Sequence, residues 1–215
     1  MEILNKLILP FAGHPIFKIE DGFKLTKPEL DYIKNLQYRK HDNGKKSLLS
    51  KSVDILKSSK LSRLKKFIKN SQEEYVANVL EIKNKFSCVQ SWAGKQSKGG
   101  HHTIHNHANH VISSVYYAKA DETSLTFHTH KSKIEESFYF DYDIKNYNIF
   151  NSQKYTVPLK TGDIIFFPGD MLHETGINKS DERIMVSASF FINGKIGLTD
   201  GLNKINITTK INDEL

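Results

Sequence analysis

The first 85 residues carry apolar positions at helical spacing. The segment TKPE, Thr26–Glu29, combines a hydroxyl N-cap, a proline in the first turn and a glutamate three residues later, so a helix is predicted to begin there. Between residues 47 and 82, apolar side chains recur every three or four residues among lysines, which predicts one short and one long helix. The expected apolar stripe consists of Leu61, Leu64, Ile68, Tyr75, Val79 and Ile82. Residues 1–85 are therefore predicted to form an N-terminal helical region.

From Phe86 onward the chain changes to short runs of β-branched and aromatic residues that Gly, Asp, Asn and Pro separate. The run GDIIFFPG is continuously apolar, which is typical of a strand buried on both faces. Helices followed by many short strands predict an α+β fold, with a sandwich or jelly roll over residues 86–195. Residues 196–215 are polar and are expected to form an edge strand or a loose tail of the same folded domain. The predicted strands lie within residues 86–94, 110–120, 124–130, 155–159, 163–169 and 182–193.

The composition, 38% hydrophobic and 26% charged over 215 residues, is that of a globular protein. No apolar run reaches the roughly 18 residues that cross a bilayer, and no signal peptide is recognisable, so no membrane partner is expected. Cys88 is the only cysteine, which indicates a reducing compartment and predicts a cytoplasmic protein.

The net charge of +7 is concentrated in residues 1–90, which hold 18 Lys and Arg against 10 Asp and Glu. A lysine-rich, solvated face explains this excess better than a nucleic-acid footprint, because the basic run lacks interleaved aromatic residues. Nucleic acid is therefore the weaker of the partners considered.

The stretch HHTIHNHANH, His101–His110, holds five histidines in ten residues. His105 and His107 are two apart, and in an extended chain such residues point to the same face, where two imidazoles can chelate one metal ion. Imidazole suits iron, zinc, copper and nickel. His173, at the end of the predicted buried strand, is the best candidate for a third ligand.

Arg183 opens the last predicted strand, and Ser187, four residues later, projects to the same face. An arginine that faces inward beside a metal is costly to bury unless it holds an anion. A guanidinium group fits a carboxylate in a bidentate manner. These residues therefore predict a metal together with a small carboxylate ligand.

The order of these residues resembles that of the iron(II)/2-oxoglutarate oxygenases: a His-x-acid pair, a distant His, an Arg about ten residues on, and a hydroxyl residue after it. Residues 116–120 and 162–191 resemble strands of the prolyl-hydroxylase-like branch. Residues 105–117 resemble an uncharacterised branch found in phages and marine bacteria. The resemblance covers about residues 88–193. It implies a double-stranded β-helix (jelly roll, cupin-like) with the N-terminal helices packed against it.

Carried over by position, the resemblance implies that His105 and His173 bind Fe(II). Arg183 would pair with the distal carboxylate of the cosubstrate 2-oxoglutarate, helped by Ser187 and the hydroxyl of Tyr117. The implied activity is a dioxygenase that hydroxylates a small-molecule or peptide substrate while 2-oxoglutarate is converted to succinate. The resemblance indicates neither the particular substrate nor the oligomeric state.

The chain departs from the family at one ligand. The usual carboxylate is missing and His107 stands in its place, with Asn109 as a weaker substitute. Three neutral imidazoles leave iron with one more positive charge than two histidines and a carboxylate. The expected metal set is therefore His105, His107 and His173, and altered oxygen reactivity is expected from it.

Two other functions are compatible with the same residues. A cupin dioxygenase with three histidines, which does not use 2-oxoglutarate, is one. The other is a non-enzymatic module with a structural metal, whose site His101, His102 or His110 would close. The spacings that resemble the two cupin motifs are Gly99-x5-His105-x-His107 and Gly162-x5-Pro168-x4-His173.

His128 and His130 repeat the His-x-His spacing but have no third ligand nearby, and Trp92 is expected in the core.

Overall fold

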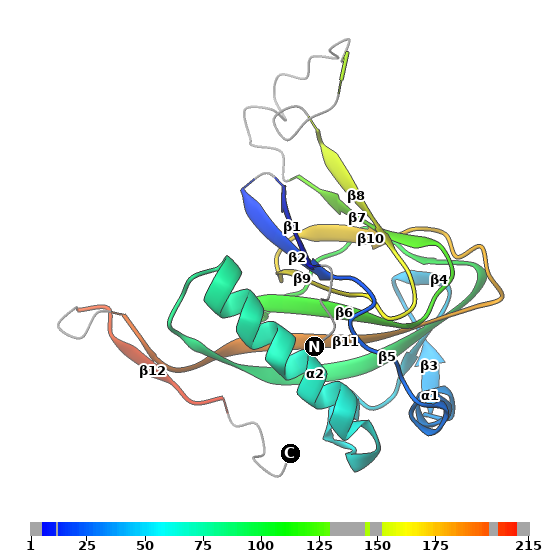
Figure 1. Cartoon of the computed structure of the whole chain (residues 1–215), viewed down its shortest axis with the longest axis horizontal. Coiled ribbons are helices and arrows are strands. Elements are labelled where there is room, and N and C mark those ends of the chain that lie inside the picture. The colour runs from blue at the N-terminus through cyan, green and yellow to red at the C-terminus, as the bar shows by residue number, and fades with distance from the viewer. Residues whose placement is uncertain (1–5, 12, 130–144, 147–151, 198–201, 210–215) are drawn as a thin grey trace.

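The structure, a computed structural model, describes residues 6–11, 13–129, 145–146, 152–197 and 202–209. Two antiparallel sheets make up most of it (Figure 1). The large sheet has the order β1-β2-β9-β6-β11-β5-β4-β3, with β12 added to β11, and the small sheet has the order β10-β7-β8. The strands are β1 Lys6–Phe11, β2 His14–Ile19, β3 Tyr38–Lys40, β4 Gly44–Ser50, β5 Lys85–His102, β6 Ile112–Lys119, β7 Thr123–His128, β8 Lys154–Leu159, β9 Ile164–Pro168, β10 Leu172–Thr175, β11 Glu182–Ile196 and β12 Ile205–Ile207.

The two sheets form the double-stranded β-helix that the resemblance implies, so the predicted α+β jelly roll is confirmed. Every strand run predicted after Phe86 corresponds to an observed strand. β5 continues well past its predicted end, as far as His102, and β10 was not predicted because it has only four residues.

Two apolar cores share the large sheet. One lies between this sheet and the helices and includes Ile68, Tyr116 and Val186. The other lies between the two sheets and includes Tyr117 and Phe127. Because side chains alternate across a strand, each central strand supplies both cores. The continuous apolar run predicted as a doubly buried strand is β9, which does this.

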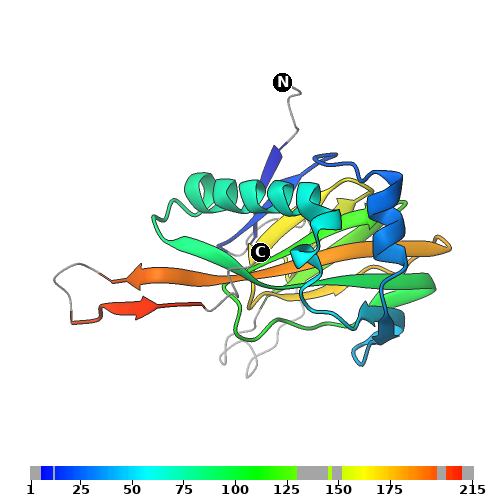
Figure 2. The same ribbon diagram turned by 90° about the horizontal axis from the view of Figure 1, so that it is seen from below.

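The helices α1, Lys27–Lys34, and α2, Ser62–Glu74, lie on one face of the large sheet (Figure 2). The capping box at Thr26 and Glu29 is present, as predicted. α2 continues as a single π-helical turn, η3, over Tyr75–Val79. No helix among the described residues is long and apolar enough to cross a membrane.

The prediction that residues 1–85 are helical is wrong in part. Four strands, β1 to β4, lie in this region and extend the large sheet at both edges. The predicted short helix is replaced by β4 and by two single 3-10 turns, η1 Ile55–Lys57 and η2 Ser59–Leu61. Pairing of β4 with β5 outweighs the local helical spacing, because it completes backbone hydrogen bonds of a central strand.

The C-terminal part of β11 and the short β12 form a hairpin that projects away from the body of the molecule (Figures 1 and 2). β12 is an edge strand, one of the two forms expected for the polar segment after residue 195.

Candidate active site

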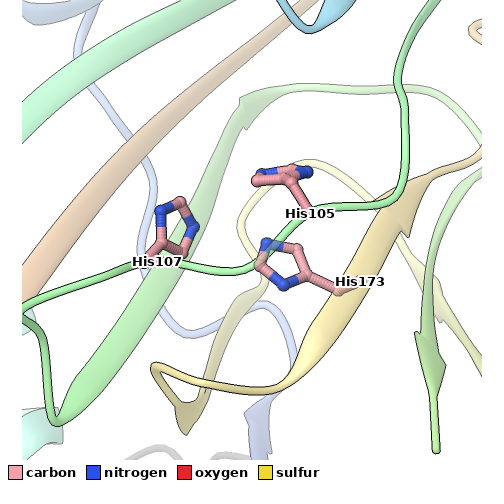
Figure 3. Close-up of side chains that lie close together, drawn as sticks. All are labelled: His105, His107 and His173. Carbon is pink, nitrogen blue, oxygen red and sulfur yellow. The ribbon is translucent and has the colours of Figure 1, made fainter. Parts of the chain in front are cut away.

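Three histidines converge at the connection between β5 and β6 and at strand β10 (Figure 3). One potential ligand atom of each of His105, His107 and His173 lies within 4.8 Å of the others. The ring centroids are 4.4 Å apart for His105 and His173, 5.1 Å for His107 and His173, and 5.2 Å for His105 and His107. The three residues that the sequence selects as ligands are therefore brought together.

Backbone hydrogen bonds fix the backbone positions of the three histidines. The amide of His105 donates to the carbonyl of His173 at 2.9 Å, and the amide of His173 donates to the carbonyl of His105 at 2.8 Å. The amide of His107 donates to the carbonyl of Gly169 at 3.0 Å. The connection that carries two of the ligands is thus held against β10 and the end of β9.

The tautomers of two of the histidines follow from their neighbours. Nδ1 of His105 lies 2.7 Å from the carbonyl oxygen of Thr103, and Nδ1 of His173 lies 2.8 Å from that of Met171. A carbonyl oxygen only accepts, so each Nδ1 donates and each Nε2 keeps its lone pair. Metal-binding histidines are oriented in this way by partners of the second nitrogen.

Burial keeps the imidazoles of His107 and His173 neutral. It lowers the pKa of His173 well below the ordinary value, and the neighbouring His105 adds to this. Burial also lowers the pKa of His107 to about 4, again with a contribution from His105. Since only the neutral imidazole ligates a metal, the donor set fits a divalent ion of the imidazole-binding kind.

The other candidate ligands do not join this group. No carboxylate of the described residues belongs to it. Asn109 is an exposed turn residue with φ of 62°, so the structure gives no support to it as a substitute ligand. His102 instead forms a hydrogen bond with the hydroxyl of Ser47 at 2.7 Å, and its ring lies tilted against that of His41, with centroids 4.4 Å apart.

The second His-x-His pair is only partly described. His128 lies on β7 and contacts the carboxylate of Glu174 at 3.0 Å, away from the three-histidine group. His130 lies outside the described residues. Trp92, expected in the core, is half-buried, and its ring lies 5.8 Å from that of His107.

Arg183 is fully buried, with 0% of its surface exposed. It lies on β11 opposite Gln96 of β5. Its guanidinium donates to the hydroxyl of Thr175 at 3.1 Å, and Thr175 is two residues after the ligand candidate His173 on β10. The inward-facing arginine that the sequence predicts is therefore present, one strand step from the histidines.

Tyr117, also 0% exposed, lies on the same side of the large sheet as Arg183. Its hydroxyl has no hydrogen-bond partner among the described residues. Burial raises the pKa of this phenol, and the nearby Arg183 lowers it. Ser187 is half-buried on the Arg183 face of β11, opposite Trp92. A buried donor without a partner beside a cation is the arrangement expected around a carboxylate ligand.

The partners of Arg183 are the site residues that the sequence does not reveal. Gln96 and Thr123 contact its guanidinium from two other strands. Thr175 was weakly indicated as a site residue by its position, because it follows His173 by two residues and so faces the same side of β10.

Comparison with known families agrees with this geometry. Residues 90–190, which include the three histidines, Tyr117 and Arg183, match the family described as "Putative 2OG-Fe(II) oxygenase". Over this stretch, which is just under half of the chain, the sequence is similar to the iron(II)/2-oxoglutarate oxygenases, a class of oxidoreductases that uses Fe(II) and 2-oxoglutarate. The match does not favour a cupin or a non-enzymatic metal module. The narrower resemblance to a phage and marine bacterial branch stays a prediction.

Solved structures of this class share the fold. HygX from Streptomyces hygroscopicus, determined with nickel and 2-oxoglutarate bound, is 10% identical, with 81% of this chain and 82% of HygX covered and a TM-score of 0.55. It has also been determined with hygromycin B bound. A Pseudomonas putida prolyl-4-hydroxylase is 11% identical, with 85% of this chain and 95% of that protein covered and a TM-score of 0.54. No curated protein matches the chain in sequence.

Proposed function

We propose that this oxygenase hydroxylates a C–H bond of its substrate at an Fe(II) ion held by His105, His107 and His173. Arg183, with Tyr117 and Ser187, would hold the distal carboxylate of 2-oxoglutarate. The observation that carries the proposal is the strand β10, whose one inward face presents His173 to the histidine group and Thr175 to the buried guanidinium.

The spacing along β10 suits this cosubstrate. Two residues of a strand span about 6.6 Å. The five-carbon chain of 2-oxoglutarate, with C–C bonds of about 1.5 Å, extends about 5 Å from end to end. A molecule of this length reaches from a metal at His173 toward the donors near Thr175.

The residues of the chain supply binding and orientation. The carbonyls of Thr103 and Met171 hold two imidazoles with Nε2 free for the metal. Arg183 would attract the distal carboxylate, and the hydroxyl of Tyr117 would donate to it. Bound Fe(II) would supply the oxidising chemistry with dioxygen as the oxidant: one oxygen atom would enter succinate, which forms with carbon dioxide from 2-oxoglutarate, and the other would enter the C–H bond of the substrate.

Arg183 also distinguishes this function from the cupin alternative. A three-histidine cupin that does not use 2-oxoglutarate has no need of a fully buried cation one strand step from the metal. Burying that charge is costly without an anion to pair with it.

The substrate is proposed to be a small molecule or a peptide. HygX with hygromycin B and the prolyl-4-hydroxylase support these two classes. Nucleic acid is less favoured, because the lysines of the first 90 residues lack interleaved aromatic side chains. A cytoplasmic location is proposed from the single free cysteine, Cys88, whose pKa burial raises to about 12.

The experiment is an anaerobic titration of the Fe(II)-loaded protein with 2-oxoglutarate, followed by visible absorption. Chelation of the 2-oxo acid should give a metal-to-ligand charge-transfer band. In Arg183→Ala the apparent Kd should rise about 100-fold, which corresponds to about 3 kcal/mol, while iron stays bound. Arg63→Ala, which removes a half-exposed arginine at α2, is the matched control and should leave the Kd unchanged.

Two results would contradict the proposal in different ways. Absence of the band with iron still bound would exclude 2-oxoglutarate as cosubstrate. Loss of iron from a folded Arg183→Ala protein would show that Arg183 supports the metal rather than the carboxylate. Melting temperatures of each variant establish that it is folded.

A further inference from the structure

Every acceptor around the guanidinium of Arg183 is neutral. Nε donates to the side-chain oxygen of Gln96 at 2.6 Å, and one terminal nitrogen donates to the hydroxyl of Thr123. The other terminal nitrogen donates to the carbonyl of Gly176 at 2.7 Å, to the hydroxyl of Thr175 at 3.1 Å and to the carbonyl of Gly100 at 3.4 Å. The hydrogen bonds of the guanidinium are largely satisfied, yet the described residues place no counter-ion against its charge.

The neighbouring carboxylates of the described residues are engaged elsewhere. Glu182 precedes Arg183 and so faces the opposite side of β11, where it pairs with Lys34 at 3.4 Å and Lys119 at 3.1 Å. Asp163, which lies near Tyr117, is paired with Lys18 at 3.3 Å. Arg183 is thus a buried cation that the surrounding chain holds without neutralising.

The side chain of Gln96 determines that the charge of Arg183 is not neutralised within the protein. It is 1% exposed and lies directly opposite Arg183 in the register of β5 and β11. Its oxygen accepts from Arg183, and its amide nitrogen donates to Thr175 at 3.4 Å. A glutamate of the same size would reach the same nitrogen but would form a buried ion pair with it, and the charge would then be compensated within the protein.

We propose that Gln96 is a positioning residue for the cosubstrate. It fixes Arg183 through Nε and, being neutral, leaves the charge of the guanidinium for the distal carboxylate of a 2-oxo dicarboxylic acid. This inference rests on the proposed function and adds a selectivity element to it. An acid at position 96 would act as a built-in competitor of the cosubstrate.

The test compares Gln96→Glu with Gln90→Glu. Gln90 is an exposed glutamine on the same strand, so the control makes the same chemical change six residues away. The Kd for 2-oxoglutarate is measured by anaerobic titration of the Fe(II)-loaded proteins, and the melting temperature is measured without 2-oxoglutarate. Gln96→Leu is a third variant, which removes the hydrogen bonds without adding charge.

We expect Gln96→Glu to raise the Kd about tenfold or more, which corresponds to about 1.4 kcal/mol, while the melting temperature is unchanged or higher. Gln90→Glu should stay within about twofold of the unmodified protein, since exposed charges are screened. Gln96→Leu should lower both the affinity and the melting temperature, because it leaves Nε without a partner.

The expected signature is the separation of affinity from stability in Gln96→Glu, which a purely structural glutamine would not give. An unchanged Kd in Gln96→Glu would overturn the inference, and so would a loss of affinity that merely follows a fall in melting temperature. If the unmodified protein does not bind 2-oxoglutarate, the proposed function itself fails, and the two failures are therefore distinguishable.

Discussion

The two parts of the candidate site, the histidine group and the surroundings of Arg183, differ in charge. At the histidine end, burial keeps His107 and His173 neutral by lowering their pKa values. At the arginine end, burial also lowers the pKa of Arg183, but a guanidinium stays protonated at any ordinary pH. One end therefore offers lone pairs without charge, and the other offers a charge without a counter-ion.

This difference shows what each end lacks. Neutral imidazole nitrogens can bind a metal cation, and a buried cation is stabilised by an anion. A metal ion together with a dicarboxylate satisfies both ends at once. Fe(II) and 2-oxoglutarate, which the family uses, have these charges.

The largest effect is expected at the histidine end, from His173→Ala. The variant removes a ligand candidate and the side chain that contacts both other histidines. Affinity for Fe(II) should fall by about 100-fold or more, because even loss of a residue that orients a ligand costs 10–100-fold. Equilibrium dialysis with metal analysis checks this.

His128→Ala is the matched control for that variant, because His128 lies on the neighbouring strand β7 and pairs with Glu174. It should bind Fe(II) as the unmodified protein does. Retention of iron by a folded His173→Ala protein would show that His173 is not a ligand of the metal.

A smaller effect, which sharpens the comparison, is expected from His107→Asp. This change restores the two-histidine and one-carboxylate set of the family and adds a negative charge at the metal. Fe(II) should bind about tenfold more tightly, since unlike charges at close range attract by several kcal/mol in a protein. The charge-transfer band with 2-oxoglutarate should move to longer wavelength as the iron becomes richer in electrons.

His107→Ala, which removes the ligand without adding charge, separates the two causes and should weaken Fe(II) binding. If His107→Asp weakens Fe(II) binding as much as His107→Ala does, an aspartate at this position does not replace the histidine as a ligand. If neither variant changes the affinity, the position does not contribute to the metal site.

The smallest effect is expected at the arginine end, from Tyr117→Phe. Losing one hydrogen bond of about 0.5–1.5 kcal/mol should weaken 2-oxoglutarate binding about threefold to tenfold. The melting temperature without ligand should stay the same or rise, because the buried hydroxyl that is removed has no partner among the described residues.

Tyr116→Phe provides the control from the adjacent residue on β6. Tyr116 faces the helices, and its hydroxyl donates to the carbonyl of Phe23 at 3.1 Å. This variant should lower the melting temperature and leave the Kd for 2-oxoglutarate unchanged. Equal behaviour of the two variants would show that Tyr117 does not touch the cosubstrate.

The strands after Phe86 were predictable because alternation and β-branched runs are local signals. The three histidines were predictable for a related reason, since the His105–His107 spacing and the position of His173 after a buried strand are visible in the sequence. Strand β4 was not predictable, because the apolar spacing that begins near Ser47 is compatible with a helix and pairing with β5 decides the outcome.

The surroundings of Arg183 were beyond local reasoning. Gln96 lies 87 positions before Arg183 and Thr123 lies 60 positions before it. Only the register between β5 and β11 places Gln96 against the guanidinium. Sequence patterns identified which residue carries the charge, whereas the packing of the sheets determined what surrounds it.

The pairing of β2 with β9 has a consequence for folding during synthesis on the ribosome. The amide of Asp21, just after β2, donates to the carboxylate of Asp163, 142 residues later, so the N-terminal hairpin has no place in the large sheet until β9 has been synthesised. At about 5–20 residues per second, that wait is about 7–30 s. During translation the N-terminal hairpin therefore stays without its partner strand β9 until these residues have been made.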